Sequence, residues 1–199
     1  MFTGIASDIG RVRAVKRSNR DLRIEVEAGL DLTGVSVGAS VLNSGCCLTV
    51  IAIGEGRFEV EATNETLACS TVGDWAAGTE INLERPQRLN GELGGHVVTG
   101  HVDAVGKVLA MIPDGGSHRL RVKVPPPLHR LIAKKGSIAI DGVSLTVTDV
   151  DLDGHDFEVC LIPHTFDVTT LGRLVAGSRV NVEIDILARY LARWLETAA

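Results

Sequence analysis

The chain has 199 residues, of which 45% are hydrophobic and 23% are charged, a composition typical of soluble globular proteins. A net charge of −5 and an aromatic content of 4% argue against a nucleic-acid partner, because such partners are bound by clustered basic and stacking side chains. No apolar run approaches the roughly 18 residues of a membrane span, so we expect no membrane partner. The first residues lack a basic segment followed by an apolar one, which predicts a cytoplasmic location.

Short runs of alternating apolar and polar residues recur along the chain and predict half-buried antiparallel strands. Clear examples are 22–27, 58–62 and 81–84 in the first half, and 120–124, 157–161 and 180–184 in the second. About six such strands in each half predict an all-β fold, and closure of each half into a small barrel would hide the strand edges. A sandwich stays open as the alternative. Prolines at 125–127 end one strand, and 128–134 is expected to form a short helix.

The two halves of the chain carry the same sequence pattern. Residues 2–12 return as 98–108, residues 45–50 as 142–147 and residues 66–84 as 165–183, at offsets of 96, 97 and 99. A period of this length indicates a duplicated domain. We therefore predict a first barrel over 1–96, a second barrel over 97–185, and two copies of one binding pocket.

The C-terminal segment, residues 186–199, differs from both repeats and is expected to form a helix. Its large apolar residues fall on one helical face, which consists of Ile186, Leu187, Tyr190, Leu191, Trp194 and Leu195. Two interpretations stay open. The helix packs against its own barrel, or identical helices from several chains pack together around an oligomer axis.

Cysteine and histidine side chains are candidate reactive groups. The cysteines, which are Cys46, Cys47, Cys69 and Cys160, have neither CxxC spacing nor matching positions in the two repeats, which predicts free thiols and no metal site. Cys47 is either a nucleophile with a stabilised thiolate or a small buried apolar residue. His101 is either a group that moves protons near neutral pH or a structural histidine.

A series of motifs spread over nearly the whole chain resembles the riboflavin synthase family. The motifs are MFTGI at 1–5, GCCLTV at 45–50, GGHVVTGHV at 94–102, IDGVSLTV at 140–147, LIPHTF at 161–166 and TTLG at 169–172. The resemblance implies two tandem, homologous, six-stranded antiparallel Greek-key barrels and a C-terminal helix. It also implies a homotrimer joined through these helices, in which the first barrel of one chain and the second barrel of the next share each site.

The resemblance further implies an activity. In the family, two molecules of 6,7-dimethyl-8-ribityllumazine dismutate to riboflavin and 5-amino-6-ribitylamino-uracil in the last step of riboflavin biosynthesis. A transferase of this kind moves a four-carbon unit from one lumazine to the other and needs neither a metal nor another cofactor. Two copies of one pocket suit a reaction between two copies of one molecule, because binding aligns the reactants.

The motifs also imply which residues form the site. The catalytic candidates are Cys47, His101, Ser144 and Thr146. The substrate-binding candidates are Gly4, Ile5, Ala6, Cys47, Leu48, Thr49, Glu61, Ala62, Thr63, Asn64, Glu65, Thr66, Gly100, His101, Val102, Lys135, Ser144, Leu145, Thr146, Leu161, Ile162, Pro163, His164, Thr165 and Phe166. Hydroxyls and main-chain groups on strand edges suit a flat heterocycle that carries a chain of hydroxyls.

The repeats differ at positions that matter for chemistry. His101 matches Ile5, and Ser144 matches Cys47. Unlike pockets are expected if one lumazine loses a proton from its 7-methyl group and the other receives a nucleophile. The alternative function is a non-catalytic lumazine- or flavin-binding protein of the antenna type, which would be expected to lose these polar groups in at least one half.

The chain departs from the family at one candidate position. The family often has glutamate where His164 stands, as Glu65 stands in the first repeat. An imidazole in place of a carboxylate leaves the contacts of the second pocket to the ribityl chain open.

Overall fold

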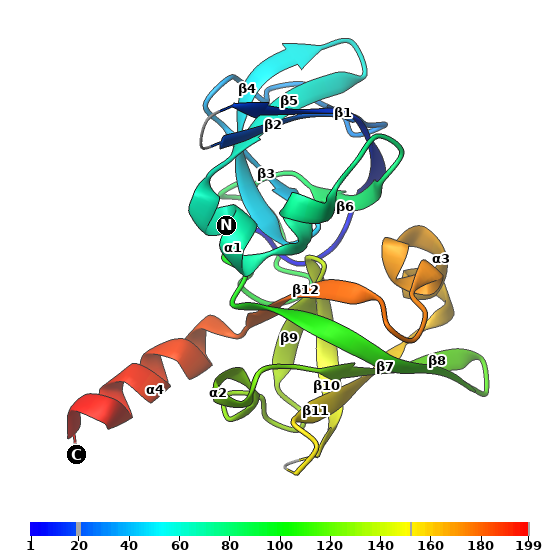
Figure 1. The fold of residues 1–199 in the computed structure, drawn as a ribbon, viewed down its shortest axis with the longest axis vertical. Coiled ribbons are helices and arrows are strands. Elements are labelled where there is room, and N and C mark those ends of the chain that lie inside the picture. Colours follow the sequence, from blue (N-terminus) through cyan, green and yellow to red (C-terminus); the bar gives the residue numbers. More distant parts are fainter. Residues whose placement is uncertain (19–20, 152, 199) are drawn as a thin grey trace.

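The computed structural model describes residues 1–18, 21–151 and 153–198, which form two stacked barrels and a projecting C-terminal helix (Figure 1). The first barrel contains β1 (Asp8–Ser18), β2 (Asp21–Glu27), β3 (Ser40–Asn43), β4 (Cys46–Gly54), β5 (Arg57–Ala62) and β6 (Glu80–Glu84). The second contains β7 (Ala104–Asp114), β8 (Ser117–Lys123), β9 (Ser137–Ile140), β10 (Val143–Asp151), β11 (Asp156–Leu161) and β12 (Arg179–Ile184). The predicted all-β fold with six strands in each half is confirmed.

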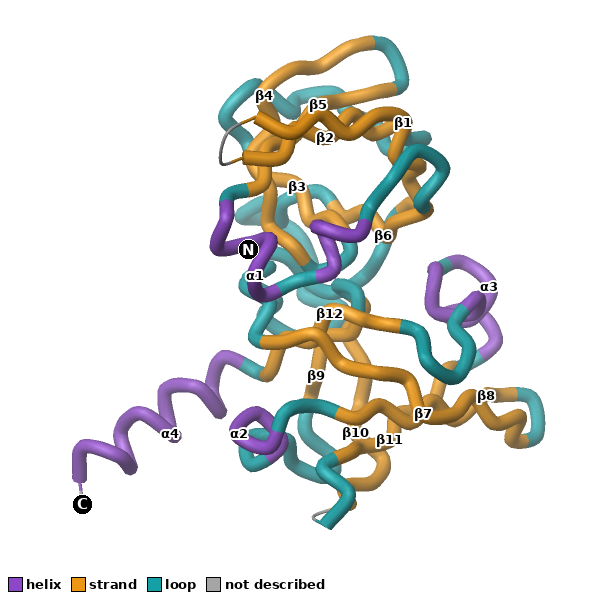
Figure 2. Tube along the Cα trace, viewed as in Figure 1, coloured by secondary structure: helices purple, strands orange, loops and turns teal. Residues whose placement is uncertain are grey.

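Each barrel is a closed antiparallel sheet with the same strand order (Figure 2). The first runs β1-β2-β5-β4-β3-β6, and the second, counted from its matching strand, runs β7-β8-β11-β10-β9-β12. These are Greek keys, and closure removes the exposed strand edges. Bulges also recur at matching places, between Val12 and Ala14 and between Val108 and Ala110. The strands therefore form closed barrels and not a sandwich.

The alternating pattern fills the two barrel interiors. In β2 the side chains of Leu22, Ile24 and Val26 are almost completely buried, and in β8 Leu120 and Val122 occupy the matching positions. Each such burial stabilises the fold by about 1.5 to 3 kcal/mol. The polar residues between them face outward, which leaves the outer surface and the rims of the barrels for binding.

Short helices interrupt the strands at matching places. In the first repeat α1 (Asn64–Cys69) and the 3-10 helix η1 (Thr71–Asp74) precede β6, and in the second α3 (Pro163–Val168) and η2 (Thr170–Arg173) precede β12.

The short helix predicted over 128–134 was placed wrongly, because α2 spans Pro126–His129. Pro126 is suited to a first helical turn. Beyond it the N–H groups of Leu131 and Ile132 bond three residues back, so the chain continues in turns and not as an α-helix.

The C-terminal helix α4 (Ile186–Ala198) points away from both barrels (Figure 1). Arg189 near its start bonds to Asp103 of the second barrel at 2.9 Å. Farther along, the large apolar side chains are exposed, with Tyr190 at 69% and Trp194 at 64%. The interpretation that this apolar face packs against its own barrel is therefore wrong. Across the described residues, no helix has the length and apolarity that crossing a membrane requires.

Two asparagines at matching positions join the barrels across a quasi-twofold axis. Asn82 donates its side-chain amide to the carbonyl oxygen of Asp141 at 2.9 Å, and its Oδ1 accepts from the N–H of Thr170 at 2.8 Å. Asn181 makes the same two bonds to the first barrel, each at 2.7 Å. These asparagine contacts are thus made twice, as in an isologous interface. The duplication is preserved in space as well as in sequence.

Candidate functional site

Each barrel receives a short segment from the other repeat. The N–H of Ser144 in the second barrel donates to the carbonyl oxygen of Gly4 at 2.8 Å, and the N–H of Cys47 in the first donates to that of Gly100 at 2.9 Å. Both glycines have positive φ, +77° and +80°, and a Cβ at either would lie 2.5 Å from the Cβ of the facing residue. Glycine is therefore required at both places. We call residues 3–6 and 99–102 the crossing segments.

A buried glutamate fixes each crossing segment to its own barrel. Glu84 in β6 accepts hydrogen bonds from the N–H of Thr3 at 2.6 Å, the hydroxyl of Thr3 at 2.7 Å and the N–H of Gly4 at 2.9 Å. Glu183 in β12 binds the second crossing segment by the same three bonds, at 2.7, 2.6 and 2.9 Å. Burial raises the pKa of Glu84, and the bonds from Thr3 and Gly4 oppose that rise. Each pocket therefore depends on both repeats.

The crossing segments diverge after their glycines. Ala6 packs against the core of the second barrel and Val102 against the core of the first. Between the glycine and these anchors stand Ile5 and His101, which are both exposed at matching positions. The second crossing segment thus presents an imidazole to the first barrel, whereas the first crossing segment presents an aliphatic side chain to the second barrel.

The pocket on the first barrel is a cavity of about 260 Å³. It lies between β4, α1 and the second crossing segment, and its lining consists of Cys46, Cys47, Glu65, Thr66, Cys69, Ser70, Gly100, His101 and Val102. The structure thus brings the predicted residues Cys47 and His101 to one cavity. Burial raises the pKa of Cys46 to about 12, so this thiol is neutral near pH 7. Among the described residues the cysteines are free, as predicted.

The matching place on the second barrel is organised around Ser144. Its Oγ lies 2.7 Å from Nδ1 of His96, a buried residue of the connector between the repeats. Burial lowers the pKa of His96, and the carboxylate of Asp185 opposes this to a smaller extent, so the imidazole is neutral near pH 7. A neutral imidazole can accept the proton of a hydroxyl bonded to it. The second barrel therefore pairs a hydroxyl with an imidazole at the place where the first barrel has a thiol.

His96 was not among the predicted site residues. The repeated segment of the second half starts at 98, so His96 has no counterpart in the first repeat and comparison of the repeats could not find it. The sequence feature that could have indicated His96 is the pair of glycines before it, Gly94 and Gly95. A Cβ on Gly95 would lie 2.8 Å from the Cβ of Ser144, so glycine lets the connector approach this strand.

Other predicted polar residues lie on the outer faces of the barrels beside these pockets. Lys135 donates its N–H to the carbonyl oxygen of Val147 at 2.8 Å, which places it next to Thr146 on β10. In the first barrel Thr49 is exposed and pairs with Glu61 of β5. The side chains of four predicted residues instead fill the barrel cores and leave only main chain for binding, namely Leu48, Ala62, Leu145 and Leu161.

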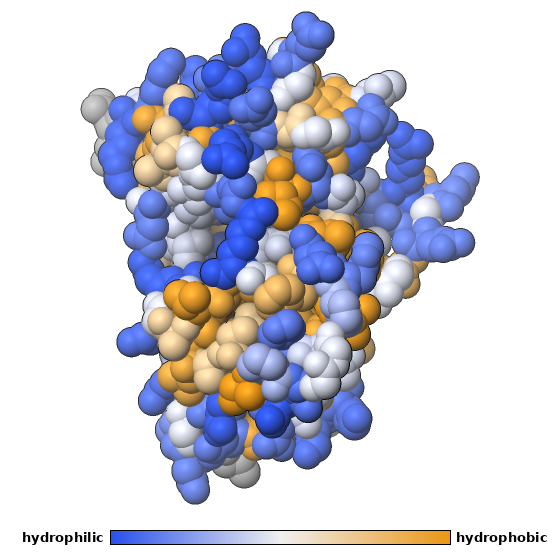
Figure 3. All heavy atoms as spheres, turned by 90° about the vertical axis from the view of Figure 1, so that its right-hand side faces the viewer, coloured by the Kyte–Doolittle hydropathy of each residue, from blue (hydrophilic) through white to orange (hydrophobic). Residues whose placement is uncertain are grey.

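The remaining predicted residues lie on or next to α1 and α3, at matching places: Thr63, Asn64, Glu65 and Thr66 in the first repeat and Ile162, Pro163, His164, Thr165 and Phe166 in the second. Glu65 and His164 are both exposed. Phe166 stacks on His118 with 4.0 Å between the ring centroids. On the face where α3 lies, apolar surface gathers over the second barrel and at the waist between the barrels (Figure 3). Ile162 and Val168 at the two ends of α3 are exposed apolar residues.

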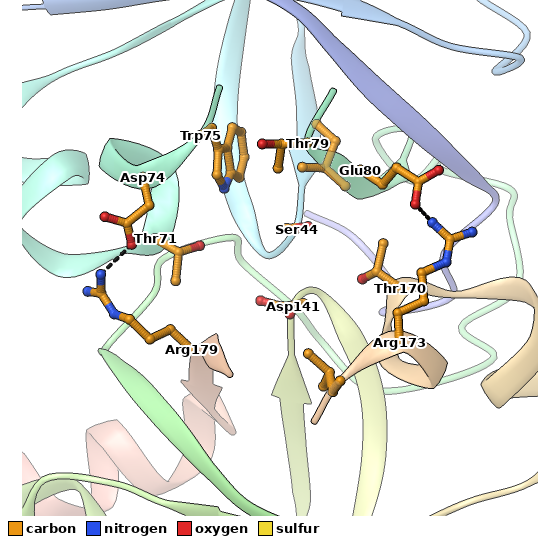
Figure 4. A pocket seen from close by; sticks show the side chains of 12 residues that line it. Ser44, Thr71, Asp74, Trp75, Thr79, Glu80, Asp141, Thr170, Arg173 and Arg179 are labelled. Atoms are coloured by element: carbon orange, nitrogen blue, oxygen red, sulfur yellow. Dashed lines mark hydrogen bonds and ion pairs between the residues drawn. The ribbon is translucent and has the colours of Figure 1, made fainter. Parts of the chain in front are cut away.

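A larger cavity of about 490 Å³ lies between the barrels at the quasi-twofold axis (Figure 4). None of the predicted substrate-binding residues is part of its lining. Asp141 lies at its centre, and burial raises the pKa of this carboxyl to about 7. The predicted residues gather elsewhere, at the cavity beside Cys47 and around Ser144 on the second barrel.

Known proteins match the chain along its whole length. The lumazine binding domain family matches residues 3–86 and again residues 99–185. The riboflavin synthase of Brucella abortus (strain 2308) is 45% identical over 198 residues, which cover 97% of each chain. That of Bacillus subtilis (strain 168) is 33% identical over 198 residues, which cover 100% of this chain and 91% of the relative. The chain belongs to the riboflavin synthase family. As a member of this family it is an enzyme, as the motifs predicted.

Solved structures share the riboflavin synthase family's duplicated fold. LumP in complex with riboflavin is 26% identical, with a TM-score of 0.84 over 92% of this chain and 99% of that one. LumP in complex with 6,7-dimethyl-8-(1'-D-ribityl) lumazine is 24% identical, with a TM-score of 0.82 over 92% and 98%. The fold is therefore shared with a protein crystallised with a lumazine and with a flavin.

Proposed function

We propose that the chain transfers a four-carbon unit between two molecules of 6,7-dimethyl-8-ribityllumazine to give riboflavin and 5-amino-6-ribitylamino-uracil. The observation that carries this proposal is a pair of matching places, at Cys47 and Ser144, that share one backbone arrangement and have different polar side chains. Two similar pockets let two copies of one substrate bind, and their different side chains let the copies play different roles. Alignment of bound reactants can contribute on the order of 7 to 11 kcal/mol to lowering the barrier.

Each pocket has a proposed task. At Ser144, the neutral imidazole of His96 accepts the hydroxyl proton, so that Ser144 can take a proton from the 7-methyl group of one lumazine. At Cys47, the thiol is the candidate nucleophile toward the other lumazine, and His101 in the same cavity exchanges protons with it. Thr146 orients the substrate at the second pocket. The other residues implied by the motifs stay the proposed contacts to the rings and ribityl chains.

Absorbance measurements test this function directly. Purified protein mixed with the lumazine should produce the absorbance of riboflavin with time, whereas an antenna-type protein would bind the lumazine and leave it unchanged. Exchanging the reactive groups tests the division of tasks. Cys47→Ser and Ser144→Cys should each reduce turnover strongly while preserving binding of the lumazine. Full turnover by either single variant would show that the two groups have no separate tasks.

We also propose that the chain acts as a cytoplasmic homotrimer joined through the exposed apolar face of α4. Trp194 and Tyr190 on this face would each bury a large apolar area in an interface. Truncation after Asp185 should therefore lower the molar mass measured by light scattering from three chains to one. An unchanged mass would contradict the role of α4.

In the proposed trimer, the first barrel of one chain and the second barrel of the next share each site. A Cys47→Ala/His101→Ala chain keeps a sound second pocket, and a Ser144→Ala/His96→Ala chain keeps a sound first pocket. Refolding the two inactive chains together should restore part of the riboflavin formation. If mass spectrometry finds mixed oligomers without recovery, the site is not shared between chains.

A further inference from the structure

The cavity between the barrels is closed on two sides by ion pairs that cross from one barrel to the other (Figure 4). On one side Asp74 of η1 pairs with Arg179 of β12. On the other side Arg173 of η2 pairs with Glu80 of β6. All four side chains are partly exposed, so these pairs add little to stability in themselves.

The two ion pairs are the same contact made twice with opposite sign. At the repeat offset of 99, Asp74 matches Arg173 and Glu80 matches Arg179. In one copy of the contact the helix position is acidic and the strand position basic, and in the other copy the signs are reversed. The first barrel is therefore acidic at both positions and the second barrel basic at both.

Contacts inside the second barrel do not account for the arginine at 179. Arg179 stands opposite Lys107 in the β12–β7 ladder, and like charges in directly opposed positions are unfavourable. Among the described residues, the acid that pairs with Arg179 is Asp74, which belongs to the other barrel. Glu80 is different, because it also pairs with Arg11 of its own barrel at 2.8 Å. The choice of arginine at 179 thus serves the contact between barrels.

We propose that these four residues form a charge code that lets a first barrel pair with a second barrel and disfavours pairing of like barrels. If two first barrels met in this geometry, Asp74 of each would face Glu80 of the other. Two second barrels would bring arginine against arginine twice. Such like-charge contacts select against wrong partners. The partner that this face fits is the unlike barrel, of the same chain or of another copy.

The charge code determines the composition of the pockets. Because the crossing segments reach the opposite barrel, pairing of unlike barrels brings His101 to Cys47 and Ile5 to Ser144. Pairing of two first barrels would bring Ile5 to Cys47 instead. Unlike pairing is therefore what keeps the two pockets chemically different.

Reversing charges in the full chain tests the attraction between barrels. We use Asp74→Arg, Arg179→Asp and the double variant, and unfold each with urea, which is uncharged, at low salt and in 1 M NaCl. Each single variant should unfold at a lower urea concentration than the parent, the double variant should recover most of the loss, and salt should shrink the differences. A double variant that loses the sum of the two single losses would overturn the proposal.

Refolding a mixture tests the selection itself. Asp74→Arg/Glu80→Arg makes both barrels basic, and Arg173→Asp/Arg179→Asp makes both acidic. Refolded together, isotopically distinguished chains of these two kinds should form a larger proportion of mixed assemblies in native mass spectrometry than two labelled parent chains do. The control is Arg13→Glu/Glu27→Arg, which inverts an ion pair inside the first barrel and should mix like the parent. The proposal would be overturned if the mixture of acidic and basic chains gave the same proportion of mixed assemblies as the mixture of two labelled parent chains.

Discussion

The matching places at Cys47 and Ser144 have the same backbone arrangement and different polar side chains. In both, a strand N–H bonds to the carbonyl oxygen of a crossing glycine, at 2.9 and 2.8 Å. The polar side chains then differ, since a thiol lies with His101 at the first place and a hydroxyl lies with His96 at the second. The interactions that fix the crossing segments are therefore the same in both repeats, whereas the side chains that these segments present are different.

The crossing glycines are expected to give the largest effect. Gly100→Ala places a Cβ 2.5 Å from that of Cys47, and strain at positive φ adds to this overlap. We expect a loss of about 2 to 5 kcal/mol in the free energy of unfolding, together with loss of riboflavin formation. Urea unfolding and the absorbance assay measure both. Gly4→Ala should do the same from the second pocket.

Gly177→Ala is the matched control for these variants. Gly177 also has positive φ, +95°, but a Cβ there would meet nothing within 4 Å. Gly177→Ala should lower the free energy of unfolding by about 1 to 2 kcal/mol through backbone strain and leave turnover unchanged. An equal loss of stability in Gly100→Ala and Gly177→Ala would show that the close approach to Cys47 is unimportant.

Variants of the two buried glutamates should affect different barrels, because each glutamate fixes the crossing segment that reaches the opposite barrel. Glu183→Gln leaves an N–H of the crossing segment facing an amide donor, which should lower the free energy of unfolding by about 1 to 3 kcal/mol. It should loosen the segment over Cys47 and speed alkylation of this thiol by iodoacetamide, as followed by peptide mass spectrometry. Glu84→Gln should cost as much while leaving the alkylation rate of Cys47 unchanged. Equal acceleration in both variants would contradict the crossed arrangement.

His96 distinguishes the second pocket through its protonation. His96→Gln keeps a hydrogen bond to Ser144 and removes the base, so turnover should fall by on the order of 100-fold. Because burial lowers the pKa of His96 in the folded state, the unfolded chain binds this proton more readily, and stability should fall as the pH drops below about 6.5. The variant should lose stability less steeply than the parent between pH 7 and pH 5. Parallel stability profiles would exclude a buried neutral His96.

A further pH-dependent effect concerns the turns that meet at the quasi-twofold axis, where Asp141 matches Ser44. Burial raises the pKa of Asp141 from 3.8 to about 7, so its ionisation opposes folding and stability falls as the pH rises from about 4 through 7. Asp141→Asn keeps an acceptor for the N–H of Asn181 and tolerates the φ of +45°. The variant should be more stable than the parent at pH 8 and similar at pH 4, measured by urea unfolding.

The strands and the duplication could be predicted because they depend on local patterns. Alternation in 22–27 or 180–184 places one face inward whatever the partner strand is, and the repeat offsets are visible in the sequence itself. The prediction of a helix over 128–134 was wrong. After Pro126 the main-chain hydrogen bonds form the turns that lead into β9, and the local sequence pattern does not encode these turns. The apolar face of the C-terminal helix was predicted correctly, and its exposure followed only from the position of α4 in the structure.

By itself the sequence determined two six-stranded units, a terminal amphipathic helix and, through its motifs, membership of the riboflavin synthase family. The tertiary structure decided which groups meet. It brought residues 3–6 to the second barrel and 99–102 to the first, and it brought His96 to Ser144, 48 positions away along the chain. Such pairings result from closing the barrels and from packing them across the quasi-twofold axis. They are contacts between residues far apart in sequence, and neither strand periodicity nor repeat matching carries information about them.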